Sequence, residues 1–78
     1  MTVRKRSIAI AGHPTSVSLE DAFWEALAEI ARAEGRTVAQ IVTEVDAART
    51  AGPEPGRENL SSALRVHVLA WYRDRSQP

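Results

Sequence analysis

The sequence predicts a mainly α-helical fold that begins with a short β-structured segment and is completed by pairing with a second copy of the chain. Residues 7–19 alternate between apolar and polar side chains, which is the period of a strand, and later stretches carry apolar side chains at helical spacing. The chain has only 78 residues and no cysteine, so it has neither the size nor the disulfides that stabilise small monomers. A homodimer is the remaining way to build a core of useful size.

The composition excludes several other classes of protein. Hydrophobic residues make up 44% of the chain, which is too many for a disordered segment. No apolar run approaches the roughly 20 residues that a membrane-spanning helix requires. The apolar stretch at residues 8–11 follows a basic start but is too short for the core of a signal peptide. We therefore expect a cytoplasmic protein.

The formal charge is zero, but the charges are unevenly distributed along the chain. Residues 1–14 contain Arg4, Lys5 and Arg6 and no acid, whereas residues 15–35 contain five acids against a single arginine. The last 20 residues are again slightly basic. We expect a basic N-terminal arm over residues 1–6, one domain over residues 7–74 and a disordered tail over residues 75–78.

The alternating segment is interrupted by Gly12, His13 and Pro14. It therefore predicts either two short strands or a hairpin with a loop at this point. Proline cannot donate a hydrogen bond to a neighbouring strand, so Pro14 should start a strand or lie on an edge.

Two helices are expected to follow without a long connection. Glu20 and Asp21 place acids in the first turn of the first helix, where the helix dipole favours them. Gly35 stands where a glycine commonly ends a helix, and Thr37 with Gln40 matches a capping box that starts the second helix. The apolar side chains at helical spacing are Phe23, Leu27, Ile30 and Ala31 in the first helix and Val38, Ile41, Val42 and Val45 in the second.

A third helix is expected from about Leu60 to Asp74. The segment 51–56 contains two glycines and two prolines and predicts a loop, after which Asn59 is a suitable N-cap. The helix is apolar over much of its circumference, which is typical of a helix buried on more than one side. We expect a single copy of the chain to be too small to cover it, which again favours a dimer.

The order of these elements resembles the ribbon-helix-helix family of small dimeric DNA-binding proteins, and in particular an uncharacterised bacterial subfamily. The resemblance covers about residues 6–72. The segments that carry it are Ile8-Ala9-Ile10-Ala11-Gly12-His13, Thr15-Ser16-Val17-Ser18-Leu19-Glu20, Phe23 to Glu34, Gly35-Arg36-Thr37, Val38 to Val45 and Asn59-Leu60-Ser61-Ser62-Ala63-Leu64.

The resemblance implies an intertwined homodimer in which two protomers pair their strands into an antiparallel ribbon above four helices, with an additional C-terminal helix. Thr15, Val17 and Leu19 would then face the helices. The dimer core would consist of Val17, Leu19, Phe23, Leu27, Ile30, Ile41, Val42, Val45, Leu64, Val68 and Trp71.

The resemblance also implies a sequence-specific transcriptional regulator, a repressor, that places its ribbon in the major groove of double-stranded DNA. Such a protein would associate with the nucleoid. Backbone N–H groups at the start of the second helix would bind a phosphate, and the arm would add salt-dependent affinity. The implied DNA-binding residues are Arg4, Lys5 and Arg6 in the arm, Pro14, Ser16 and Ser18 on the ribbon, and Arg36, Thr37 and Val38 at the helix start.

Two alternatives remain open at this point. If residues 7–11 form an extra strand beside residues 15–19, the dimer would carry a four-stranded sheet, which is too broad for a groove about 12 Å wide. The first strand would then have to move aside, or the fold would serve another purpose. The second alternative is a dimeric protein-interaction module, including an antitoxin-like role, with little or no specific DNA binding.

Nothing in the sequence indicates an enzyme, a metal site or a cofactor. The serines and histidines are not placed in a pattern that suggests a Ser-His-acid site. His13 and His67 have no partner at metal-ligand spacing, and there is no glycine-rich phosphate-binding loop.

Overall fold

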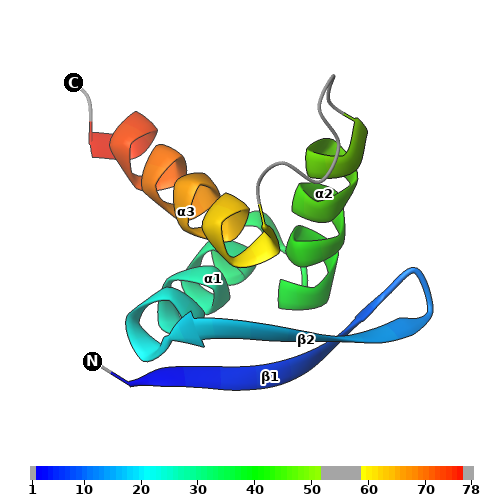
Figure 1. The fold of residues 1–78 in the computed structure, drawn as a ribbon. Helices are drawn as coiled ribbons and strands as arrows, with labels where there is room; N and C mark the ends of the chain where they lie inside the picture. Colours follow the sequence, from blue (N-terminus) through cyan, green and yellow to red (C-terminus); the bar gives the residue numbers. More distant parts are fainter. Residues whose placement is uncertain (1, 52–58, 77–78) are drawn as a thin grey trace.

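The computed structural model describes residues 2–51 and 59–76 and contains a β-hairpin followed by three helices. The elements are β1 (Val3–Ile10), β2 (His13–Glu20), α1 (Asp21–Glu34), α2 (Val38–Ala51) and α3 (Leu60–Ser76). Figure 1 shows all three helices on one side of the hairpin. The predicted fold class, mainly α with a short N-terminal β segment, is confirmed. No helix within the described ranges is long and apolar enough to cross a membrane.

Of the two interpretations of residues 7–19, the hairpin is the one observed. β1 and β2 pair antiparallel from Val3 opposite Glu20 to Ile10 opposite His13. Ala11 and Gly12 form a two-residue turn with φ values of 52° and 81°, and positive φ at both positions is the mark of a type I′ turn. This turn has the twist that joins neighbouring antiparallel strands.

Ala11 is the one described residue other than glycine with a positive φ, and its side chain makes that backbone conformation unfavourable. We expect Ala11→Asn to raise the free energy of unfolding by about 0.5 kcal/mol, because asparagine tolerates this conformation and Asn-Gly favours type I′ turns. Urea unfolding followed by circular dichroism measures the change. Gly12→Ala is the opposing control and should lower stability; equal stability of all three proteins would contradict the turn geometry.

The hairpin is longer than the sequence pattern indicated. β1 begins at Val3, so residues 3–6, which we expected to form an arm separate from the domain, belong to the strand. The reason is that β2 extends to Glu20 and offers a partner to every residue of β1 back to Val3. At the other end, α3 continues past Asp74 to Ser76, so residues 75 and 76 are helical. Of the expected loop at 51–56, Ala51 belongs to α2, and residues 52–56 lie outside the described residues.

The helix boundaries follow the capping residues in the sequence. Gly35 has φ 64°, and the N–H of Arg36 donates to the Ala31 carbonyl at 2.9 Å, which is the hydrogen bond of a Schellman motif. The Gln40 N–H donates to Thr37 Oγ1 at 3.1 Å while the Thr37 N–H donates to Gln40 Oε1 at 2.8 Å. Asn59 Oδ1 accepts from the Ser62 N–H at 2.8 Å. All three predicted caps are confirmed.

A core is formed within one copy of the chain. Its fully buried side chains come from the hairpin and from every helix: Val17, Leu19, Leu27, Ile30, Ile41, Val42 and Leu64. Of the residues expected to form a dimer core, Val45 and Val68 are also buried, while Phe23 and Trp71 are partly buried at the margin. We expected that one chain could not cover α3. This holds for one side of the helix, where Val66 and Leu69 are 59% and 56% exposed.

Candidate nucleic-acid interface

The hairpin has an inner face against the helices and an outer face that the helices leave open (Figure 1). Residues directly opposite each other in an antiparallel pair share a face, so the register fixes both sets. Val17 and Leu19 lie on the inner face with 1% and 0% exposure, as the alternation predicts. The outer face consists of Val3, Lys5, Ser7 and Ala9 from β1 and Pro14, Ser16, Ser18 and Glu20 from β2.

The outer face carries short side chains and little charge. Pro14 and Ser16 are exposed and Ser18 is partly buried. Ser7 lies directly opposite Ser16, so sequence reasoning missed a third serine of this face. The signal that could have located Ser7 was the alternation of residues 7–11, which places it on the same face as Ser16 once the two segments pair. Lys5 is the only cation among these outer-face residues.

The cluster of Arg4, Lys5 and Arg6 is divided between the two faces by the strand. Arg4 Nε donates to Asp21 Oδ1 at 2.7 Å, and the Arg6 guanidinium lies 5.1 Å from the centroid of the Trp24 ring. The hydrogen bond and the charge of Asp21 raise the pKa of Arg4, and the hydrogen bond from Arg4 lowers the pKa of Asp21. The structure therefore directs two of these three cations toward α1.

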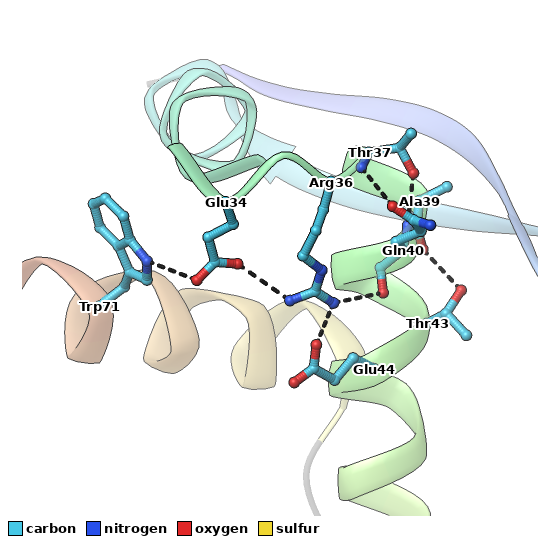
Figure 2. Close-up of polar contacts among 8 residues, drawn as sticks. All are labelled: Glu34, Arg36, Thr37, Ala39, Gln40, Thr43, Glu44 and Trp71. Carbon is cyan, nitrogen blue, oxygen red and sulfur yellow. Dashed lines mark hydrogen bonds and ion pairs between the residues drawn. The ribbon is translucent and has the colours of Figure 1, made fainter. Parts of the chain in front are cut away.

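The start of α2 has both free backbone donors and an arginine that is already engaged (Figure 2). The capping box uses the N–H groups of Thr37 and Gln40. Within the described residues, the N–H groups of Val38 and Ala39 have no hydrogen-bond acceptor, so they remain available to an anion at the positive end of the helix dipole. Thr37 is exposed and Val38 is partly buried.

Arg36 is held between two acidic side chains at this corner (Figure 2). Its guanidinium donates to Glu34 Oε1 at 3.1 Å, to the Gln40 carbonyl at 3.3 Å and to the Glu44 carboxylate. The hydrogen bond to Glu44 is the main reason that the pKa of Arg36 is raised, and Glu34 adds to the effect. The sequence placed Arg36 at the helix start correctly but gave no sign that two carboxylates would offset its charge.

Two other arginines are also paired with acids. Arg65 on α3 donates to both carboxylate oxygens of Glu20 at 3.0 Å, and Arg49 lies 2.6 Å from Asp46. The pKa of Glu20 is lowered by a hydrogen bond from its own backbone N–H and then by Arg65. Attraction to a polyanion therefore depends on those cations of the described residues that are not paired with an acidic side chain. Lys5 is the cation of this kind on the outer face.

A two-stranded ribbon with one face on helices and one face open defines a β-ribbon protein. A family model described as "Ribbon-helix-helix domain" matches residues 3–72. The chain therefore belongs to the ribbon-helix-helix family, as its sequence motifs indicated. Members of this family are generally DNA-binding transcription regulators or antitoxins, typically form homodimers and are typically not enzymes.

One solved structure is similar over nearly the whole chain. It is described as an uncharacterised protein from Bordetella pertussis Tohama I, with a TM-score of 0.79 and 33% sequence identity. The match covers 96% of this chain and 59% of that one, so this chain corresponds to only part of the longer protein. A comparison with curated proteins found no match. Within the described residues, no group of three or more histidine, cysteine or acidic side chains is placed to hold a metal ion.

Proposed function

We propose that the protein is a sequence-specific DNA-binding transcription regulator, acting as a repressor, which places the outer face of its β-ribbon in the major groove. The observation that carries the proposal is the open outer face of a hairpin whose other face is buried on helices. The major groove admits a two-stranded ribbon, and short side chains on that face allow the backbone to approach the bases closely. Membership of the family supports the same class of function.

Each part of the interface has a distinct role in this proposal. Ser16 and Ser18, joined by Ser7, form hydrogen bonds to base edges, while Pro14 makes only apolar contact. Serine hydroxyls both donate and accept and therefore discriminate weakly between bases. The N–H groups at Val38 and Ala39 bind a backbone phosphate and fix the orientation of the ribbon. A two-fold homodimer would read two equivalent half-sites, and in a cell the bound protein would lie in the nucleoid.

Fluorescence anisotropy against DNA from the protein's own promoter region, with scrambled DNA as the reference, tests the proposal across a salt series. Preferential binding that persists at physiological salt is the expected result. Binding that ignores sequence and vanishes as salt rises would reduce the interaction to electrostatic attraction alone. Absence of binding even at low salt would overturn the proposal.

We expect Lys5→Ala to weaken binding and to reduce the slope of log K against log salt by about two, because the homodimer loses one phosphate contact in each protomer and each lost contact removes about 0.9 from that slope. Arg73→Ala is a matched control, since Arg73 lies in the last turn of α3, and Figure 1 shows that end of α3 away from the hairpin. The triple variant of Arg4, Lys5 and Arg6 should change the slope little more than Lys5→Ala does. An unchanged slope in the triple variant would exclude β1 from phosphate binding.

The second candidate is a dimeric protein-interaction module with little or no specific DNA binding. The observation in its favour is the apolar side of α3, where Val66 and Leu69 are exposed to solvent. These two side chains line a hollow together with Phe23 and Tyr72. An antitoxin-like role belongs to this class. Sedimentation of the wild-type protein and of Leu69→Glu would show whether this side of α3 mediates self-association.

A further inference from the structure

Arg36 lies beside the start of α2, but its guanidinium is directed along the side of the helix. The guanidinium donates to the Gln40 carbonyl at 3.3 Å and to the Glu44 carboxylate, both on α2. Figure 2 shows it between Glu34 and Glu44. In an α-helix the carbonyls point toward the C-terminal end and the N–H groups toward the N-terminal end. The guanidinium therefore lies away from the free N–H groups that face an anion at the helix start.

The two carboxylates that hold Arg36 differ in exposure and in their other contacts. The Glu34 side chain is 28% exposed, and its second oxygen accepts from Trp71 Nε1 at 3.1 Å. The Glu44 side chain is 59% exposed, and among the described residues its carboxylate accepts a hydrogen bond only from Arg36. Water and salt weaken an exposed ion pair, so Glu44 is the partner that a competing anion displaces first.

A DNA phosphate has the chemistry to replace Glu44. Arginine presents five N–H donors in a planar fork that matches phosphate as well as carboxylate. Arg36 makes the contacts described above through its two Nη atoms, and among the described residues its Nε has no acceptor. Arg36 directly precedes Thr37, whose hydroxyl caps α2. Rotation of the arginine side chain can therefore carry the guanidinium from the side of the helix to its start.

We propose that Glu44 holds Arg36 in a resting position, and that DNA binding transfers the guanidinium from Glu44 to a backbone phosphate beside the start of α2. The transfer rests on the proposed function. Because the ion pair with Glu44 must break before the phosphate contact forms, Glu44 lowers the affinity for DNA and acts as a positioning residue through Arg36. A two-fold homodimer contains this contact twice, so its effect on affinity counts twice in each complex.

Glu44→Gln tests the proposal, because this variant removes the charge and keeps the size of the side chain. In the fluorescence anisotropy assay we expect it to raise the affinity for DNA about four- to tenfold, since an exposed ion pair is weakened in each of two protomers. Glu25→Gln, at an exposed position on α1, is the matched control for the loss of one negative charge and should have a smaller effect. Unchanged or weaker binding by Glu44→Gln would overturn the proposal.

The same two substitutions in an Arg36→Ala background show whether Glu44 acts through Arg36. With the guanidinium removed, we expect Glu44→Gln to change the affinity no more than Glu25→Gln does, because a double-mutant cycle isolates the interaction between two residues in contact. A full four- to tenfold gain in this background would mean that Glu44 acts through its charge alone, and the positioning role would be wrong.

Nitrogen NMR of the arginine side chains tests the resting position without DNA. We expect the two Nη atoms of Arg36 to give separate signals, because each has its own partner and rotation of the guanidinium is restricted. Arg73, whose guanidinium has no partner among the described residues, should give one averaged signal. An averaged signal from Arg36 would contradict the proposal. Separate signals from a protein that binds no DNA would instead remove the proposed function and, with it, the transfer to phosphate.

Discussion

Replacing Leu64 with alanine is expected to lower the free energy of unfolding by about 2–5 kcal/mol, the range measured for buried leucines in other proteins. Leu64 is 0% exposed and lies where α3 closes the core formed by the hairpin and the first two helices. A domain of this size has a total stability of only about 4–12 kcal/mol. The variant should therefore show a much lower urea midpoint or be partly unfolded without denaturant.

Leu69→Ala is the matched control for this experiment. It makes the same chemical change five residues later on α3, but Leu69 is 56% exposed, so we expect a loss below about 1 kcal/mol. The comparison tests whether α3 is part of the core of one chain. Equal losses at both positions would mean that α3 does not pack against the rest of the chain in the observed orientation.

Leu19→Asp is expected to prevent folding at neutral pH. Leu19 is 0% exposed. No polar or charged residue is buried in the described part of the chain, so a new carboxylate would have no buried partner. The variant loses the burial of a leucine and must also desolvate a charge, which together exceed about 5 kcal/mol. Circular dichroism should show the loss of helix, and Val42→Asp, at another fully buried position, should behave in the same way.

Ser16→Asp is the control on the opposite face of the same strand. Its side chain is exposed, so we expect the variant to fold with stability within about 0.5 kcal/mol of the wild type. A new carboxylate on the outer face should nevertheless abolish binding to DNA if this face approaches the phosphates. A folded Leu19→Asp protein, or an unfolded Ser16→Asp protein, would contradict the assignment of the two faces.

Local signals in the sequence predicted most of the fold. The capping box at Thr37 and Gln40, the glycine at position 35 and the cap at Asn59 each act over a few residues, and each is found where the sequence placed it. The alternation of residues 15–19 separated the buried Val17 and Leu19 from Ser16 on the other face. The caps and the alternation pattern each involve only a few neighbouring residues, which explains why they could be recognised without a structure.

The parts that could not be predicted depend on contacts between residues distant in the chain. The extent of β1 depends on its pairing with β2, which runs as far as Glu20. The engagement of Arg4 by Asp21 and of Arg65 by Glu20 joins residues 17 and 45 positions apart. The run of basic residues at positions 4–6 therefore indicated a cationic surface, whereas the structure pairs Arg4 with Asp21 and places Arg6 against the Trp24 ring.

At the corner between α1 and α2, hydrogen bonds connect Arg36, at the start of α2, to the indole ring of Trp71 through Glu34. Glu34 accepts from Arg36 at one carboxylate oxygen and from Trp71 Nε1 at the other, at 3.1 Å in both cases (Figure 2). An anion bound at the start of α2 would compete with Glu34 for Arg36 and so alter the hydrogen bond at the indole. In a Trp24→Phe background, Trp71 would be the only tryptophan, and its emission would report occupancy of that helix end without any attached label.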